Sequence, residues 1–134
     1  MTAPAQTSPT KSKGKILLVE DDPLVVKMYS TKLESLGFET LIAQDGEQAV
    51  ELAKKEKPIF ILLDIMLPKL SGLDALKAIR ALPSAKNTPV IVLSNLCEEK
   101  EKKQAEKLGV KEYLVKADLT PSQVVERIQK YLKQ

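Results

Sequence analysis

Short apolar segments alternate with longer amphipathic segments along the chain from Lys15 onward. The first, third and fourth apolar segments are nearly continuous runs of Val, Ile and Leu, which is typical of strands buried on both faces of a parallel sheet. Glu, Thr or Lys interrupt the second and fifth, as in edge strands. The pattern predicts an α/β fold with a five-stranded parallel sheet, and it is compatible with the strand order 2-1-3-4-5. The five segments are KILLVE (15–20), FETLIA (38–43), IFILLD (59–64), VIVLS (90–94) and EYLVK (112–116).

Capping signals mark the starts of the helices between these strands. Asp22 before Pro23 and Asp45 before an amphipathic stretch have the form of N-caps. Ser71-Gly-Leu-Asp74 and Thr120-Pro-Ser-Gln123 have the form of capping boxes. The signals predict one helix after each of these positions.

A further helix is expected between residues 98 and 108, where Glu and Lys dominate and few apolar side chains can hold it against the sheet. This helix is therefore predicted to be weakly held and largely exposed. Five strands and five helices in alternation account for a single domain in a chain of 134 residues. Residues 1–14 are rich in Thr, Ser, Pro and Lys, and are expected to form a disordered tail.

The composition excludes several classes of function. The chain has no histidine, which excludes Ser–His and Cys–His catalysis, imidazole metal sites and a role as phosphohistidine carrier. Cys97 is the only cysteine, so an intrachain disulfide and a cysteine zinc site are excluded, and the adjacent Glu98 and Glu99 disfavour a redox role. The net charge of +3 is spread over mixed charges and aromatic content is 4%, which predicts no direct nucleic-acid binding. No secretory signal or long apolar run is present, so a cytoplasmic protein without membrane insertion is expected.

Charged and polar residues stand at the carboxyl ends of four predicted strands. Glu20-Asp21-Asp22 follow the first strand, and Asp64, Ser94 and Lys116 end the third, fourth and fifth. In an open parallel sheet these ends lie along one edge, where ligands bind. The sequence therefore predicts one site that contains several carboxylates, a hydroxyl and an ammonium group.

These residue types fit phosphoryl chemistry assisted by a divalent cation. Carboxylates that repel one another favour a cation, and Mg²⁺ prefers oxygen ligands. An ionised aspartate is an established covalent nucleophile, and Lys and Ser can bind the oxygens of a phosphoryl group. Asp22 also fits a helix cap and Ser94 alone is weak evidence, so the prediction depends on the whole set.

The order and spacing of four motifs resemble the receiver domain of two-component response regulators. The motifs are ILLVEDDP (16–23), ILLDIMLPKLSG (61–72), VIVLSN (90–95) and YLVK (113–116). The match runs from Lys15 to about Leu132, so residues 15–134 are assigned to a receiver domain similar to stand-alone chemotaxis regulators. The resemblance implies a flavodoxin-like, doubly wound sheet of order 2-1-3-4-5 with five helices. It also implies a signalling module that promotes its own aspartyl phosphorylation rather than a conventional enzyme.

The resemblance implies a phosphoacceptor and a set of metal ligands. Asp64 would accept a phosphoryl group from a histidine kinase or a histidine phosphotransfer protein. Asp22 and Asp64 would bind Mg²⁺ directly, and Asp21 would act through water. The main-chain carbonyl of Met66 would complete the protein's contribution.

The resemblance also implies a switch. Lys116 would contact the phosphoryl group, Ser94 would be the switch hydroxyl, and Tyr113 would be the aromatic residue that turns inward. Two residues depart from the family pattern. Ala117 follows Lys116 where the family usually has proline after a cis bond, so a trans bond is expected here and the path of the loop is open. Asn95 stands where the family often has a small residue, and its effect on phosphorylation kinetics is open.

The expected output is a protein–protein contact through the fourth helix, the fifth strand and the fifth helix, since the sequence stops just past the last helix. A domain taken from a longer protein remains an alternative. So does a receiver-like scaffold that binds partners without phosphorylation. A magnesium-dependent aspartyl-phosphate phosphatase is a further alternative, although such enzymes commonly carry a second acid two residues after the nucleophile, where this chain has Met66.

Overall fold

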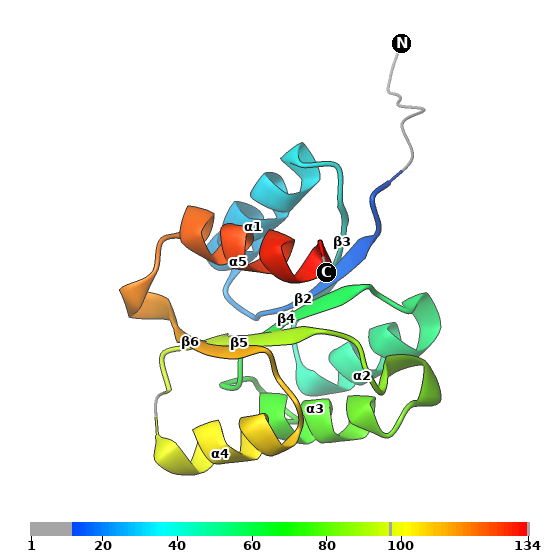
Figure 1. Ribbon diagram of the computed structural model, residues 1–134. Coiled ribbons are helices and arrows are strands. Elements are labelled where there is room, and N and C mark those ends of the chain that lie inside the picture. Colours follow the sequence, from blue (N-terminus) through cyan, green and yellow to red (C-terminus); the bar gives the residue numbers. More distant parts are fainter. Residues whose placement is uncertain (1–11, 97, 134) are drawn as a thin grey trace.

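The computed structural model describes residues 12–96 and 98–133, and these residues form one parallel sheet flanked by helices (Figure 1). The order of the described strands is β3-β2-β4-β5-β6, which confirms the predicted order 2-1-3-4-5 and the flavodoxin-like fold. Most of the tail predicted for residues 1–14 lies outside the described residues, and so does Cys97. The strands are β2 (Lys15–Val19), β3 (Glu39–Ala43), β4 (Phe60–Leu63), β5 (Val90–Ser94) and β6 (Glu112–Val115).

Helices cover both faces of the sheet. Figure 1 shows α1 and α5 side by side on one face, and α2, α3 and α4 on the other. Within the described ranges, no helix is both long enough and apolar enough to cross a membrane. The helices are α1 (Pro23–Ser35), α2 (Gly46–Glu56), α3 (Gly72–Arg80), α4 (Glu99–Lys107) and α5 (Pro121–Leu132), with short 3₁₀ turns η1 (Pro83–Ala85) and η2 (Lys116–Asp118).

The predicted caps define where the helices begin. The side chain of Asp22 accepts a hydrogen bond from the N–H of Leu24, and Asp45 caps α2 in the same way. Thr120 and Gln123 form the predicted reciprocal capping box. Ser71 accepts the N–H of Asp74, but the carboxylate of Asp74 accepts a bond from the Ser71 hydroxyl instead of reaching the backbone. Asp is one methylene shorter than the Glu of a full capping box, which explains this difference.

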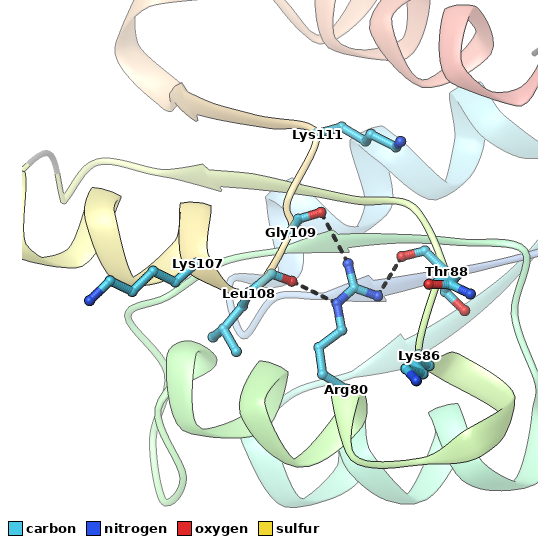
Figure 2. Close-up of a pocket in the computed structure, with 8 residues that line it drawn as sticks. Arg80, Lys86, Thr88, Lys107, Leu108, Gly109 and Lys111 are labelled. Atoms are coloured by element: carbon cyan, nitrogen blue, oxygen red, sulfur yellow. Dashed lines mark hydrogen bonds between the residues drawn. The ribbon is translucent and has the colours of Figure 1, made fainter.

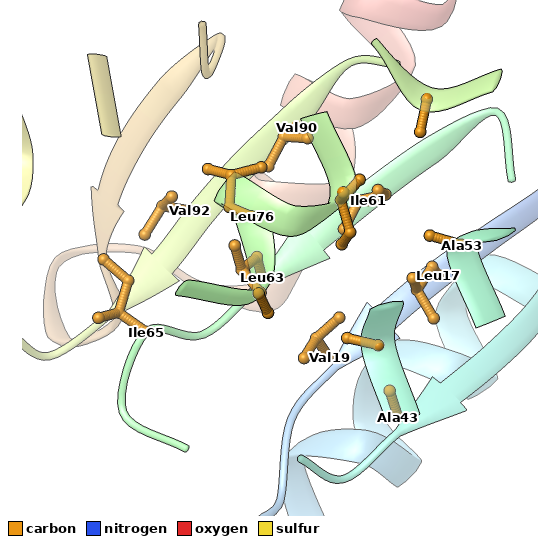
Figure 3. Packing of buried hydrophobic residues seen from close by; sticks show 14 of the residues in the cluster. Leu17, Val19, Ala43, Ala53, Ile61, Leu63, Ile65, Leu76, Val90 and Val92 are labelled. Atoms are coloured by element: carbon orange, nitrogen blue, oxygen red, sulfur yellow. The ribbon is translucent and has the colours of Figure 1, made fainter. Parts of the chain in front are cut away.

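Strand side chains alternate between two hydrophobic clusters, one on each face of the sheet. Leu17 and Val19 point toward α2, α3 and α4, whereas Ile16 and Leu18 point toward α1 and α5. Figure 3 shows Leu76 of α3 facing the strand side chains in the first cluster. Each fully buried Leu or Ile contributes roughly 1.5–3 kcal/mol relative to exposure, so the two clusters fix the sheet register. The ends of the strands are positioned by this packing.

Helix α4 is held less firmly than the others, as the sequence predicts. Ala105 is its only buried residue, and its N-cap residue Glu98 makes no side-chain capping bond. Most of its Glu and Lys side chains are exposed. The helix therefore rests on few apolar contacts, which matters for how it can move.

Candidate functional site

The carboxyl ends of β2, β4 and β6 bring three charged side chains into direct contact. The ammonium of Lys116 lies 2.8 Å from Glu20 Oε1 and 2.9 Å from Asp64 Oδ2. Both carboxylates are buried, at 3% and 6% exposure, and the lysine side chain is 21% exposed. Side chains alternate along a strand, and each of the three residues stands two positions after a leucine that packs under α1 and α5. They therefore lie on the same face of the sheet as these leucines, which are Leu18, Leu62 and Leu114.

Backbone groups fix the two carboxylates further. Asp64 Oδ1 accepts the N–H of Met66 at 3.0 Å, and Glu20 Oε2 accepts the N–H of Asp22 at 3.1 Å. The N–H of Asp64 donates to the carbonyl of Val19, which ties the end of β4 to β2. Each carboxylate thus accepts one backbone bond and shares Lys116, so its position is defined before any ligand binds.

A glycine allows the loop after β4 to pack this closely. A Cβ on Gly72 would lie 2.3 Å from the carbonyl oxygen of Asp64 and 2.6 Å from Cα of Ile65. The N–H of Gly72 donates to the carbonyl of Ile65 at 2.9 Å. Only glycine fits here, because the atoms it meets belong to the backbone and cannot rotate away. The start of α3 is therefore packed directly behind Asp64.

Three carboxylates form a group that fits a cation. Glu20, Asp21 and Asp64 each offer an oxygen within 4.8 Å of the other two, and Asp21 is exposed while the others are buried. An all-oxygen set of this kind suits a hard divalent ion such as Mg²⁺. Met66, whose carbonyl is the further expected ligand, follows in the adjacent loop and is an exposed residue.

Asp22 is placed differently from the sequence expectation. Its carboxylate is exposed and caps α1, and it does not belong to the group of three. Glu20 takes part instead; its place at the end of the first strand was predicted, but no ligand or switch role was assigned to it. The proline at the first position of α1 is the signal that separates them, because it marks Asp22 as the helix cap.

Burial and pairing shift the pKa values of the charged pair. Burial is the largest effect on Glu20 and raises its pKa, although Lys116 and the N–H of Asp22 act in the opposite direction. For Lys116 burial is again the largest single effect and would lower the pKa, but its hydrogen bonds to Glu20 and Asp64 outweigh it and raise the pKa overall. Lys116 therefore remains a cation at neutral pH.

On the other face of the sheet, Ser94 and Tyr113 each make a hydrogen bond to the backbone of Leu96. Ser94 is fully buried and its Oγ accepts the N–H of Leu96 at 3.2 Å. The hydroxyl of Tyr113 donates to the carbonyl of the same residue, at 2.5 Å. Tyr113 also packs against the cluster beneath α2, α3 and α4. The hydroxyl groups of Ser94 and Tyr113 thus both hold the backbone of Leu96, shortly before α4 begins.

The loop after Lys116 reaches the site by a trans path. No cis peptide bond occurs in the described residues, so the expected trans bond to Ala117 is confirmed. Lys116 begins the 3₁₀ turn η2, and its ammonium still reaches Asp64. Asn95 is exposed beside Ser94. The reach of the lysine, open from the sequence, is therefore defined without the proline.

The family model for the response regulator receiver domain matches residues 16–129. Among curated proteins, the transcriptional regulatory protein CpxR of Escherichia coli is 38% identical over 120 residues, which cover 90% of this chain and 50% of CpxR. The alkaline phosphatase synthesis transcriptional regulatory protein PhoP of Bacillus subtilis is 35% identical over 119 residues, with 89% and 48% covered. The chain spans about half the length of these relatives.

Two solved structures show the same arrangement of the chain. The chemotaxis protein CheY4 of Vibrio cholerae superposes with a TM-score of 0.80 at 27% identity, covering 90% of this chain and 98% of that one. The receiver domain of the sensor histidine kinase PA1611 of Pseudomonas aeruginosa has a TM-score of 0.80 at 30% identity with the same coverage, and carries a magnesium ion in its active site cleft. The sequence match over residues 16–129 and the shared fold lead to one conclusion: this chain belongs to the receiver domains of two-component response regulators.

Proposed function

We propose that this receiver domain accepts a phosphoryl group on Asp64 in the presence of Mg²⁺ and thereby changes a partner-binding surface. The observation that carries the proposal is the position of the Asp64 carboxylate. It is buried at a strand end, 2.9 Å from the ammonium of Lys116, and shares a group of oxygens with Glu20 and Asp21. A structural ion pair alone has no need of the additional acidic groups, which repel one another.

Asp21 and Asp64 are the proposed direct ligands of Mg²⁺, with the Met66 carbonyl as a third protein ligand. Glu20 is proposed to have a different role: its Oε1 lies 2.8 Å from the Lys116 ammonium, and its Oε2 accepts the N–H of Asp22. It would instead orient the lysine. The ion would neutralise charge on the phosphoryl oxygens as the group is transferred.

The donor is proposed to be the phosphohistidine of a histidine kinase or histidine phosphotransfer protein. A carboxylate oxygen of Asp64 attacks phosphorus, the new P–O bond forms, and the P–N bond to the imidazole breaks. The imidazole leaves with the electron pair and takes up a proton from solvent. Lys116 then contacts a phosphoryl oxygen in place of the Asp64 oxygen, and Ser94 can donate its hydroxyl proton to another, since its described bond uses Oγ as acceptor.

Helix α1 offers a docking surface for that donor. Leu24 and Met28 lie one turn apart and are 78% and 42% exposed. Both belong to the helix that begins directly after Asp21 and Asp22, so an apolar strip borders the carboxylate site. Apolar side chains of a helical donor would bury these residues while presenting a histidine to Asp64.

The output is proposed to pass through α4, β6 and α5. Movement of Ser94 toward a phosphoryl group would displace Leu96, because both Ser94 and Tyr113 make hydrogen bonds to the Leu96 backbone. Leu96 stands at the entry to the weakly held α4. A protein partner is proposed for this surface. The relatives named as transcriptional regulators are about twice as long as this chain, so DNA contact by a longer protein is compatible with the same switch.

Intact mass spectrometry after incubation with Mg²⁺ and acetyl phosphate tests the proposal. We expect a single adduct of about 80 Da, the mass of one phosphoryl group, that disappears without Mg²⁺ and in Asp64→Asn. Asp22→Asn is the matched control and should keep the adduct, because Asn caps a helix as well as Asp. No adduct in the parent protein would favour a phosphorylation-independent scaffold. An adduct that persists in Asp64→Asn would identify a different acceptor.

A further inference from the structure

Arg80 joins three separate segments through its guanidinium group. It is the last residue of α3, and it donates from Nε to the carbonyl of Leu108 at 2.7 Å and from Nη2 to that of Gly109 at 3.3 Å. Its Nη1 donates to the carbonyls of Ala85 at 3.0 Å and Thr88 at 2.7 Å. Figure 2 shows the group between the loop before β5 and the loop after α4. One side chain thus ties the end of α4 to two other parts of the fold.

The charge of Arg80 serves the chain itself. The surrounding hollow of about 480 Å³ is also lined by Lys86, Lys107 and Lys111, and none of the described residues that line it carries a carboxylate. These lysines are exposed, whereas the guanidinium is directed at carbonyl oxygens (Figure 2). Burial lowers the pKa of Arg80, but an arginine stays charged in proteins. The half-buried guanidinium of Arg80 therefore binds four carbonyls of the chain itself. It lies at the amino ends of β5 and β6, whereas Asp64 lies at the carboxyl end of β4.

The two ends of α4 differ in how they are held. At the C-terminal end, Leu108 and Gly109 accept the bonds from Arg80. At the N-terminal end, Glu98 gives no side-chain cap, and Oε1 of Glu101 is buried without a hydrogen-bond partner in the described part of the chain. That end also follows Leu96, the residue held by the switch hydroxyl and the switch aromatic. The helix is anchored where it ends and loosely held where the signal would arrive.

We propose that Arg80 is the pivot of α4: it holds the C-terminal end of the helix in place, so that a change at Ser94 and Leu96 swings the N-terminal end. The proposal rests on the proposed phosphorylation of Asp64 for the source of the movement. The anchoring itself is a property of the unmodified protein. Arg80 acts as a positioning residue, since it lies away from the reacting atoms.

The planar guanidinium is required for this role. Its N–H groups diverge in one plane and reach carbonyls on both sides, whereas an ammonium presents three donors from a single atom. Lysine at position 80 would keep the charge but leave carbonyls of Ala85, Thr88, Leu108 or Gly109 without a donor. Arg80→Lys therefore separates the geometry of the clamp from its charge.

Nuclear magnetic resonance of the full chain provides the test. Backbone amide shifts are compared before and after adding Mg²⁺ and beryllofluoride, which mimics a phosphoryl group. In the parent protein we expect large changes for amides 98–102 and small ones for 106–109. In Arg80→Gln the changes should extend over 106–109. Lys77→Gln, an exposed position on the same helix, is the matched control and should retain the parent's gradient.

Amide hydrogen exchange without Mg²⁺ tests the anchor separately. Relative to the strands β2 and β4, exchange at 105–109 should rise by at least about tenfold in Arg80→Gln, and by an intermediate amount in Arg80→Lys. Unchanged exchange there, or parent shift changes that are uniform along α4, would overturn the pivot. The parent gradient decides the question if Arg80→Gln does not fold. If exchange at 105–109 rises in Arg80→Gln as expected but no amide responds to beryllofluoride, the phosphorylation proposal is refuted, and the pivot with it.

Discussion

Replacing Lys116 by methionine should expose the electrostatic cost of the site. Methionine keeps most of the apolar stem but removes the only cation that pairs with Glu20 and Asp64 among the described residues. Removing one partner of a buried ion pair typically costs 3–5 kcal/mol, because a charge remains buried without compensation. The folded variant can limit that cost by protonating one carboxylate.

The expected loss of stability follows from the free energy needed to protonate one of the two carboxylates. Protonating Glu20 at pH 7, starting from its ordinary pKa of 4.5, costs about 3.4 kcal/mol at 1.36 kcal/mol per pH unit. At pH 5 the same step costs only about 0.7 kcal/mol. A raised pKa in the folded state favours folding at low pH, and this contribution is lost as the pH rises from about 4.5 through the folded value. We therefore expect Lys116→Met to lose about 3 kcal/mol at pH 7 and about 1 kcal/mol at pH 5.

Urea unfolding followed by circular dichroism, with EDTA present, measures both values. Lys69→Met is the control, because Lys69 lies 3.7 Å from Asp45 with its side chain 64% exposed. Such a pair contributes at most about 1 kcal/mol and should change little between the two pH values. A loss in Lys116→Met that is equal at pH 5 and pH 7 would show that packing, not charge, holds the site. A loss below about 1 kcal/mol at pH 7 would refute the reasoning altogether.

Three further predictions address the metal, a tyrosine and a glycine. Asp21→Asn should weaken the apparent Mg²⁺ affinity, measured from the rise in urea midpoint with Mg²⁺ concentration, by about tenfold or more. Asp22→Asn should bind Mg²⁺ about as tightly as the parent, and equal effects of the two substitutions would return Asp22 to the ligand set. Burial raises the pKa of Tyr29 to about 12. The neutral phenol therefore contributes its full share to the stability of the folded protein below pH 10, and this contribution is lost as the pH rises toward 12. Tyr29→Phe should then unfold at higher pH in an alkaline titration, and an unchanged midpoint would contradict this. Gly72→Ala should cost about 3 kcal/mol and reduce the phosphoryl adduct, because its Cβ meets the Asp64 backbone; a folded, fully active variant would show that the loop yields.

Much of the fold was predictable because local patterns and packing agree. The continuous apolar residues of β4 and β5 require burial on both faces, and each strand residue there is buried. Asp45 and Thr120 cap the helices that their sequence context predicts. Helix α4 has few apolar residues, which predicted its exposure, and in the structure only Ala105 of this helix is buried. In each case the information lies within a few residues of the element.

The position of the acidic group was harder to predict, because it depends on a shift of one residue. Strand β2 ends at Val19, so Glu20 continues the alternation and points to the side of Asp64 and Lys116. Counting in steps of two from Leu18 would have placed Glu20 there. The predicted helix cap at Asp22, which Pro23 indicates, would have argued against Asp22 as a direct ligand. The motif alone does not distinguish three consecutive acids.

The contacts of Arg80 could not be predicted in this way. Its bonds to Leu108 and Gly109 span 28 and 29 residues and end on carbonyls, which every residue has. No side-chain pattern marks such acceptors. The bond from Tyr113 to the carbonyl of Leu96 is of the same kind. Backbone acceptors become specific only when the tertiary fold brings particular loops together.

The arrangement of Lys116 between two carboxylates suggests how one lysine would serve both states of the proposed switch. If Lys116 paired with Asp64 alone, phosphorylation would remove its only partner oxygen and free the side chain to rotate. Glu20 would prevent this, because its Oε1 lies 2.8 Å from the ammonium and would take no part in the proposed transfer. The backbone N–H of Asp22 holds the other oxygen of Glu20, so the carboxylate itself cannot follow the lysine away. Under the proposed phosphorylation, Lys116 would stay directed at the end of β4 while its second contact would change from a carboxylate to a phosphoryl oxygen. The cost of burying Glu20, visible as a raised pKa, is the counterpart of that fixed aim.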